Sequence, residues 1–283
     1  MRSTFYKVTG RLSRQHKIAL VADTHNTPCG GILEDLKTKN PDIIILAGDI
    51  IYGAKIDRST FPYNPHRLWL EEFMNADKLV HSLPEIAPTF FSYGNHEWLL
   101  TPADEKRIED AGITILHNAW TRYGELLIGG LSSPDVGNYR IFQEEYRRKH
   151  PTDTKGNLRR TYFSWQTHEI RKTPDTSWLR EYEEADGYKL LICHHPEYWE
   201  LKQPKLKNHQ IDLVLAGHAH GGQIRLGNRG LFATGQGWFP KYTSGLHYGD
   251  HGSMVISRGL SNTMQLPRLF NPCEMVYVDI VPN

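Results

Sequence analysis

The sequence predicts an α/β protein, because apolar runs alternate with helical patterns along its first half. Five β-rich apolar runs each lead directly into a polar cluster, at residues 17–25, 42–50, 88–97, 189–197 and 211–220. Helical patterns follow the first three runs, at residues 30–40, 66–83 and 102–112. The repetition of strand, helix and strand predicts a sheet with crossover helices.

The composition of each element supports this order. Continuous Ile, Leu and Val without alternation is typical of strands covered on both faces. The pattern at 102–112 has Pro102 near its start and Gly112 at its end, as helices often do. From about residue 222, many glycines and short β-type runs predict antiparallel strands and turns, and residues 273–281 predict a final strand. Trp238 and Phe239 in this part are expected to pack in the core or at an edge, or to stack on a substrate.

Length and composition predict one soluble domain spanning residues 1–283. Hydrophobic residues make up 39% and charged residues 23% of the chain. Residues 132–162 are polar and rich in Arg and Tyr, so we expect a surface excursion there. No apolar run reaches the length of about 18 residues that spans a bilayer, and the basic start leads straight into the first run, so we expect no signal peptide.

Charge and cysteine content limit the functional class. The 33 Lys and Arg nearly balance the 32 Asp and Glu, which argues against an extended nucleic-acid surface but leaves room for a small phosphorylated substrate. The three cysteines are far apart and never in a CxxC spacing. A reducing, cytoplasmic setting is therefore expected, and a thiolate zinc site is not. The oligomeric state stays open.

The polar clusters hold the candidate functional residues, because ligand sites in α/β sheets form beyond the carboxyl ends of the strands. The candidates all carry an oxygen or imidazole donor: Asp23, His25, Asp49, Asn95, His96, His194, His218 and His220. In an extended chain alternate side chains point the same way, so His218 and His220 should aim at one point. A single such pair is more often turn chemistry, and Asp23 or Asp49 alone could cap a turn. Five polar clusters that follow five apolar runs are a far more specific signal of a shared ligand site.

This donor set predicts a dinuclear metal centre. Carboxylate, amide and imidazole groups without thiolate favour manganese, iron or zinc over a structural zinc site. The set is too large for one open catalytic ion and suits two, provided that one carboxylate bridges them. Two ions about 3.5–4 Å apart can hold a phosphoryl group and lower the pKa of a shared water to near neutrality.

Five ordered motifs resemble the signature of the calcineurin-like metallophosphoesterase superfamily. They are DTH (23–25), GDIIYG (48–53), GNHE (94–97), HHP (194–196) and GHAH (217–220). The resemblance implies an α/β fold of four layers, an αββα sandwich of two mixed β-sheets flanked by helices. The GGQ at 221–223 and the segment 258–275 further resemble a bacterial branch whose members often carry GHTHGGQ.

The resemblance also implies a role for each candidate. The implied ligands of the first ion are Asp23, His25 and His220, those of the second are Asn95, His194 and His218, and Asp49 bridges. His96 would bind no metal, but would stabilise the transition state and protonate the leaving oxygen. Glu97 is expected to orient His96. His195 is left out, because strand alternation points it away from His194.

The implied function is hydrolysis of a phosphomonoester, phosphodiester or pyrophosphate bond by a hydroxide that bridges the two metal ions. The finer resemblance leaves a narrower alternative open, a nucleotide-sugar pyrophosphatase of lipid assembly with peripheral membrane association. A third hypothesis is a non-catalytic scaffold that kept the fold. The presence of every motif residue favours the enzyme.

Overall fold

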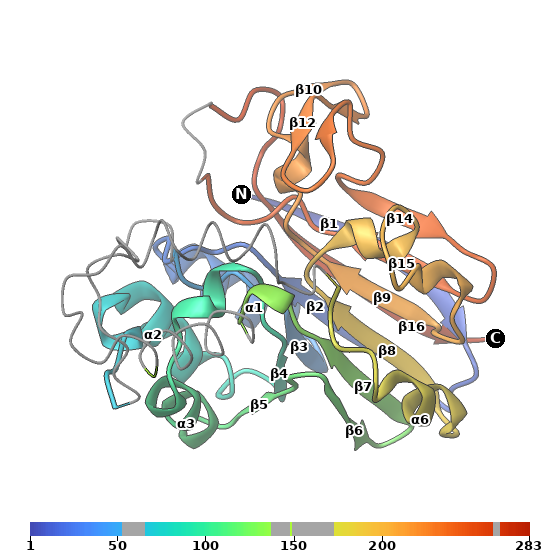
Figure 1. Ribbon diagram of the computed structural model, residues 1–283, viewed down its shortest axis with the longest axis horizontal. Coiled ribbons are helices and arrows are strands. Elements are labelled where there is room, and N and C mark those ends of the chain that lie inside the picture. The colour runs from blue at the N-terminus through green and yellow to red at the C-terminus, as the bar shows by residue number, and fades with distance from the viewer. Residues whose placement is uncertain (53–65, 137–147, 149–172, 263–266) are drawn as a thin grey trace.

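Two six-stranded mixed sheets form the body of the protein (Figure 1). The structure, a computed structural model, describes residues 1–52, 66–136, 148, 173–262 and 267–283. The first sheet has the order β1-β16-β2-β3-β4-β5, with strands Arg2–Gly10, Glu274–Pro282, His16–Val21, Ile43–Leu46, Thr89–Phe91 and Ile113–Ile115. The second has the order β14-β15-β9-β8-β7-β6, with strands Gly245–Tyr248, Ser253–Ile256, Leu213–Ala216, Tyr188–Cys193, Leu126–Leu131 and Ala119–Tyr123.

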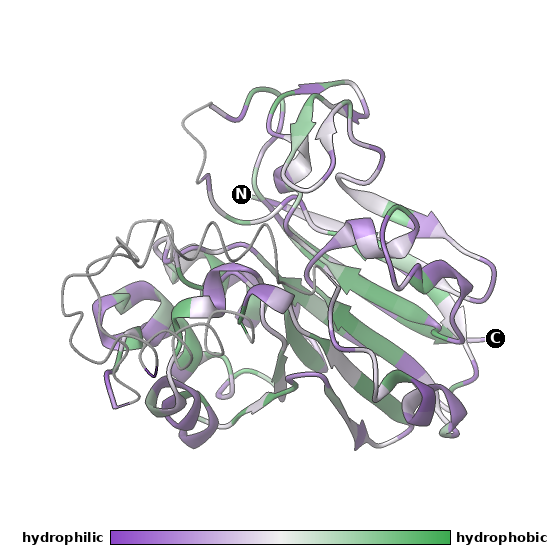
Figure 2. Ribbon diagram, in the orientation of Figure 1, coloured by the Kyte–Doolittle hydropathy of each residue, from purple (hydrophilic) through white to green (hydrophobic). Residues whose placement is uncertain are grey.

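The central strands are mostly apolar because both of their faces are covered (Figure 2). Along β2, Ile18 and Leu20 belong to the core between the two sheets, whereas Val21 packs on the outer face with the helices. Along β9, Leu215 joins the core between the sheets and Val214 packs on the opposite side. The inner cluster draws on both sheets and so holds them face to face.

Helices cover the outer faces and complete four layers. On the first sheet these are α1 (Gly30–Lys39), α2 (Met74–Ser82) and α3 (Pro102–Asp110), and on the second α6 (Leu179–Glu184). The described short 3-10 helices are η2 (Leu70–Glu72), η3 (His96–Leu99), η4 (Pro196–Trp199), η5 (Leu206–Asn208) and η6 (His220–Gly222). The predicted α/β class with two mixed sheets flanked by helices is confirmed.

The helix predicted for residues 66–83 is wrong in its first half, since α2 begins only at Met74. Phe73 has φ −101° and ψ 66°, which interrupts a helical path. Asn26 Oδ1 accepts hydrogen bonds from Asn75 N at 2.9 Å and Ala76 N at 3.0 Å, and so satisfies donors in the first turn. A tertiary contact from a distant loop therefore sets the helix start.

The strands confirm the prediction where it rested on apolar runs and depart from it elsewhere. The five predicted runs match β2, β3, β4, β8 and β9 to within two residues at their starts, and the predicted final strand matches β16 to within one residue at each end. Strand β1, which pairs in parallel with β16, and the hairpin of β6 and β7 were not predicted. Residue 222 onward forms short antiparallel pairs: β10 (Arg225–Leu226) with β11 (Arg229–Gly230), and β12 (Phe232–Ala233) with β13 (Gly237–Trp238).

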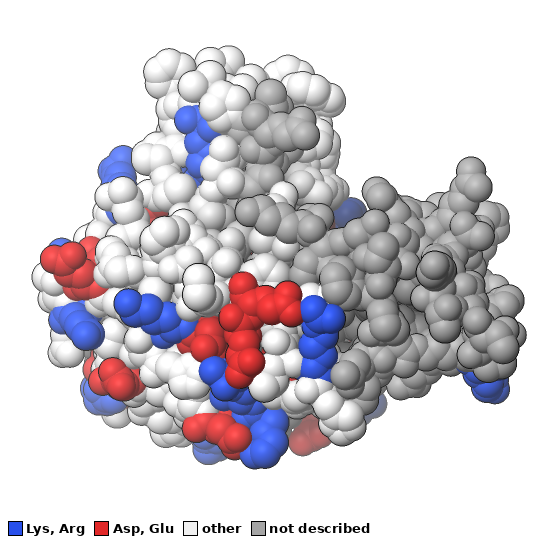
Figure 3. All heavy atoms as spheres, turned by 90° about the vertical axis from the view of Figure 1, so that its left-hand side faces the viewer, with Lys and Arg blue, Asp and Glu red and all other residues white. Residues whose placement is uncertain are grey.

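Three further observations concern the surface. Trp238 and Phe239 are 70% and 77% exposed, so packing in the core is wrong, whereas an edge position and stacking on a substrate stay predictions. Residues 137–147 and 149–162 of the predicted excursion lie outside the described residues. Side chains of both charge signs are interspersed on the face that Figure 3 shows. Within the part of the chain that the structure describes, none of the helices is long and apolar enough to cross a bilayer.

Candidate metal centre

The candidate residues follow the carboxyl ends of five strands, as the sequence predicted. Strands β2, β3 and β4 run parallel in one sheet, and β8 and β9 run parallel in the other. The residues that follow these strands meet in one buried site between the sheets. Among the described residues the ligand-type atoms form four groups, each within 4.8 Å, and two of these groups consist only of predicted ligands: Asp23, His25 and His220, and Asp49, His194 and His218.

Asp49 lies between these groups. Its Oδ2 is 3.6 Å from His25 Nε2 in the first group and 3.2 Å from His194 Nε2 in the second. His96 Nε2 lies 3.9 Å from the same oxygen. A single carboxylate that reaches donors of both groups has the position of a bridging ligand.

In the described chain, Nδ1 of His96 is buried without a hydrogen-bond partner. Among the proposed ligands, two atoms are in the same state, His25 Nε2 and Asn95 Oδ1. A buried polar atom without a partner costs free energy, and such atoms in native structures call for an explanation such as a bound ion. Both are donors that first-row cations accept. The residues present therefore fit metal ions, and the combination of oxygen and nitrogen donors fits manganese, iron or zinc.

The backbone fixes the orientation of two of the imidazoles. His194 Nδ1 lies 2.7 Å from Ala47 O, and His25 Nδ1 lies 3.1 Å from Ile51 O. Each Nδ1–H can donate to its carbonyl, which leaves the Nε2 lone pair directed at the carboxylates. This arrangement sets the tautomer that a metal ligand needs.

The backbone at the site is strained, and this corrects the reasoning from strand alternation. The φ angles are positive at 54° for Asp23, 43° for His25, 57° for Asp49, 66° for His218 and 46° for His220. Strand β9 ends at Ala216, so His218 and His220 lie on a turn and not on an extended strand. Non-glycine residues in the left-handed region cluster at functional sites, because the surrounding structure must hold them there.

The glycines of the motifs make room for the ligand carboxylates. A Cβ on Gly94 would lie 2.3 Å from Asp49 Oδ1, and one on Gly217 would lie 2.6 Å from Asp23 Oδ2. Real Cβ atoms do not approach so closely without displacement of a neighbour. The glycines before Asn95 and His218 therefore permit the close packing that draws the two sheets' loops together.

Burial and charge have opposite effects on the histidines. Burial lowers the pKa of His25 and His218, which favours the neutral rings that bind metals. Burial acts on His194 too, but the charge and hydrogen bond of Asp49 prevail and raise the pKa of His194 to about 10. Metal binding must displace that proton, so loading should weaken as the pH falls.

Glu97 has a different role from the one expected. Its Oε2 accepts from Asp49 N at 2.8 Å and Gly94 N at 2.7 Å, and its Oε1 accepts from Ile50 N at 2.8 Å. Glu97 thus ties the loop after β3 to the loop after β4 and does not orient the His96 ring. Burial and the nearby Asp49 charge raise the pKa of Glu97 to about 7.

Replacing Glu97 with alanine should lower the stability of the metal-free protein. The change leaves three buried N–H groups without their acceptor, at a cost of about 3 kcal/mol or more. Thermal unfolding followed by circular dichroism should show a fall in Tm of about 6–12 °C. The matched control is Glu109→Ala on the exposed face of α3, which should shift the Tm by no more than about 2 °C. Equal melting temperatures for the two variants would contradict this role.

His96 and His195 border the centre in different ways. The His96 side chain is 17% exposed, against 1% for His25, so it is the more open to a bound substrate. His195 Nε2 lies 2.9 Å from Ser133 Oγ and its Nδ1 lies 3.6 Å from a Glu197 oxygen. His195 also forms a ligand-type group with Glu197 and His218, which sequence reasoning did not anticipate.

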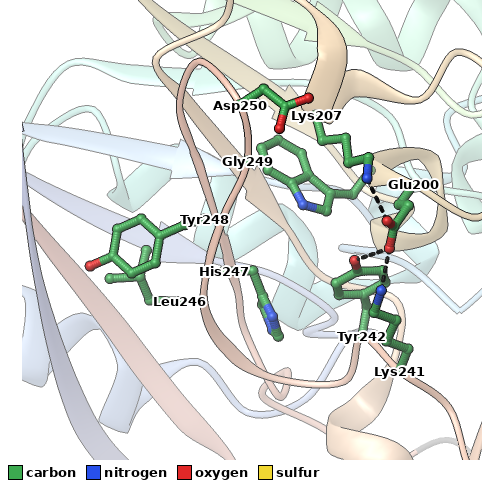
Figure 4. A pocket seen from close by; sticks show the side chains of 10 residues that line it. Glu200, Lys207, Lys241, Tyr242, Leu246, His247, Tyr248, Gly249 and Asp250 are labelled. Carbon is green, nitrogen blue, oxygen red and sulfur yellow. Dashed lines mark hydrogen bonds and ion pairs between the residues drawn. The ribbon is translucent and has the colours of Figure 1, made fainter.

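A cavity of about 490 Å³ lies away from these ligands (Figure 4). Glu200 accepts hydrogen bonds there from Lys207 at 2.5 Å, from Lys241 and from Tyr242 Oη at 2.6 Å. These bonds, that from Lys207 first, lower the pKa of Glu200 to about 2. The two lysines already share a carboxylate, so this cavity offers less to a phosphate than the metal centre does.

Two groups of carboxylate and imidazole ligands around a shared aspartate, at the junction of two mixed sheets, are typical of a metal-dependent phosphoesterase. The chain belongs to the calcineurin-like phosphoesterase family, whose sequence model matches residues 16–222. This range contains all eight predicted site residues.

Relatives along most of the chain are distant. Phosphodiesterase YaeI of Escherichia coli K12 is 24% identical over 283 residues, covering 94% of this chain and 82% of YaeI. Protein F40B5.2 of Caenorhabditis elegans is 23% identical over 278 residues, or 92% of this chain, which spans only 47% of that relative. The crystal structure of a dimetal phosphatase from Danio rerio matches with a TM-score of 0.43 and 12% identity, covering 86% of this chain and 87% of that one.

Proposed function

We propose that the protein is a phosphoesterase that uses two metal ions. The proposal depends on the position of Asp49, whose Oδ2 lies 3.6 Å from His25 Nε2 and 3.2 Å from His194 Nε2. Membership of the calcineurin-like family supports a phosphoric ester as the substrate. The name of the E. coli relative supports testing a phosphodiester first.

The proposed ligands follow the two groups, and Asn95, which belongs to neither of them, is added to the second because the motif resemblance implies it. Those of the first ion are Asp23, His25 and His220, those of the second are Asn95, His194 and His218, and Asp49 is shared. Bound manganese, iron or zinc would supply positive charge to the phosphoryl oxygens and a water of lowered pKa as nucleophile. The chain itself orients the rings through Ala47 O and Ile51 O.

His96 is the proposed proton donor to the leaving oxygen. Its backbone N–H donates to Asp49 Oδ1 at 2.9 Å, which fixes the start of η3 against the shared carboxylate. Its side chain is the more exposed at the centre, so a small phosphorylated substrate can reach it. General acid catalysis of this kind contributes about 10²–10⁴-fold to a rate.

Metal removal tests this function directly. The purified protein should contain about two first-row ions per chain by elemental analysis and should hydrolyse bis(p-nitrophenyl) phosphate. Chelation should abolish both the metal content and the hydrolysis, and added Mn²⁺ should restore them. A protein that binds the ions but hydrolyses neither this diester nor p-nitrophenyl phosphate would support the scaffold hypothesis. Hydrolysis that survives complete loss of metal would contradict the proposal.

A further inference from the structure

Two motif segments outside the proposed ligand set pack against each other beside His220. They are GGQ (221–223) and the part of 258–275 that follows residue 266. Asn271 Nδ2 donates to His220 O at 2.7 Å and to Gln223 O at 3.1 Å. A Cβ on Gly221 would lie 2.1 Å from Asn271 Oδ1, so glycine is needed for this approach. The two motifs therefore form one structural unit.

This unit places Arg268 against the metal centre. The adjacent Leu269 is held by a hydrogen bond of 3.0 Å from Arg225 N to its carbonyl, so β10 and Asn271 both anchor the backbone that directly follows Arg268. Arg268 Nη2 lies 3.3 Å from His220 Nδ1 and donates to Arg258 O. Its Nε and Nη1 are buried and have no partner among the described residues.

Arg268 differs from the neighbouring Arg225 and Arg258 in that two of its nitrogens, Nε and Nη1, are buried with neither a hydrogen-bond acceptor nor a carboxylate among the described residues. Arg225 donates to Gly221 O at 2.8 Å and to Asn228 O at 2.6 Å, and Arg258 Nε lies 3.6 Å from Glu274 Oε2. In the described part of the chain, no carboxylate forms an ion pair with Arg268. A buried guanidinium without an anion is costly, so its free N–H groups favour an anionic ligand.

We propose that Arg268 forms an anion-binding subsite that takes a second phosphoryl group of the substrate, beside the one that is hydrolysed. The inference rests on the proposed phosphoesterase function. His220 Nε2 lies 3.6 Å from Asp23 Oδ1, whereas its Nδ1 faces Arg268. The His220 ring therefore lies between the guanidinium and the Asp23 carboxylate, which places Arg268 at the margin of the metal centre. A planar guanidinium suits two phosphate oxygens.

The substrate class that fits is a pyrophosphate diester. Its hydrolysis consumes one water: the water oxygen bonds to one phosphorus, the bond from that phosphorus to the bridging oxygen breaks, and the other phosphate leaves after taking a proton. Arg268 would bind oxygens of the phosphoryl group that is not attacked. A simple diester has no such group, so the subsite should discriminate between the two substrates.

The test compares the metal-loaded wild-type protein with Arg268→Gln, Arg268→Lys and Arg229→Gln, the last an exposed arginine on the same lobe. Arg268→Gln should lower kcat/KM for UDP-glucose about 100-fold, because a desolvated charge-assisted contact is lost. Arg268→Lys should lower kcat/KM for UDP-glucose about 10-fold, because lysine keeps the positive charge but lacks the two parallel N–H donors of the guanidinium. All variants should keep their metal content, and the two Arg268 variants should lose far less of their activity towards bis(p-nitrophenyl) phosphate than towards UDP-glucose. Arg229→Gln should resemble wild type with both substrates.

A binding measurement separates this inference from the proposed function. Calorimetry with methylenediphosphonate, which cannot be hydrolysed at its P–C–P linkage, should show binding to the metal-loaded wild-type protein that is about 100-fold weaker with Arg268→Gln. Equal losses with both substrates, accompanied by loss of metal, would show that Arg268 only positions His220 and would overturn the subsite. The subsite would also be overturned if the wild-type protein hydrolysed bis(p-nitrophenyl) phosphate but did not bind methylenediphosphonate. Absence of metal and of all hydrolysis in the wild type would instead overturn the proposed function.

Discussion

The Asp49→Asn variant is expected to lose both metal ions and to fall in activity by at least about 10³-fold. Asparagine keeps the size of the side chain and an oxygen for the N–H of His96, which Asp49 Oδ1 accepts at 2.9 Å. It removes the negative charge that lies nearest to both His25 and His194, since Asp23 Oδ1 is farther away, at 3.9 Å from His25 Nε2 and 4.0 Å from His194 Nε2. A carboxylate shared by two cations stabilises both, so its loss should affect both sites at once. Elemental analysis and hydrolysis of bis(p-nitrophenyl) phosphate measure the two effects.

The matched control is Asp42→Asn at the opposite end of the same strand. Asp42 is exposed and accepts from Lys17 N at 2.7 Å, far along β3 from the proposed ligands. This variant should keep about two ions per chain and the wild-type rate within about 3-fold. If Asp49→Asn binds two ions and keeps more than a tenth of the activity, Asp49 does not bridge.

The convergence of the site could be predicted because it depends on strand direction. Each apolar run ends in a polar cluster, and parallel strands bring their carboxyl ends to one edge. The details depend on backbone conformation instead. Side-chain alternation in an extended chain predicted that His218 and His220 aim at one point. Instead, both residues have left-handed backbones on a turn after β9, and they belong to different ligand groups.

Contacts between distant segments explain the other departures. Glu97 was expected to orient its neighbour His96, but besides the nearby Gly94 N–H its oxygens accept the N–H groups of Asp49 and Ile50, which are 48 and 47 residues away in the chain. Arg268 is separated from His220 by 48 residues, and only the fold brings it to within 3.3 Å of the ring. Strand β1 has a mixed exposure pattern at a sheet edge, so it lacked the continuous apolar run that revealed β2.

The His96→Gln variant is expected to keep its metal ions and to lose about 10²–10⁴-fold in kcat. His96 stands in a ligand-type group with His25 and Asp49, so geometry alone also permits it to bind a metal. If it acts as the acid for the leaving oxygen, the loss should be larger for a phenyl than for a p-nitrophenyl leaving group, because the poorer leaving group needs the proton more.

Metal content separates the two roles of His96. Elemental analysis of His96→Gln should match the wild type and the control His251→Gln, an exposed histidine outside the centre. If His96 is the proton donor, the variant should keep its metal ions, and its rate loss should increase with the pKa of the leaving group. Loss of an ion together with an equal rate loss for both leaving groups would assign His96 to the ligands. The bridging position of Asp49 would stand in either case, because it depends on the distances to His25 and His194 and not on the ring of His96.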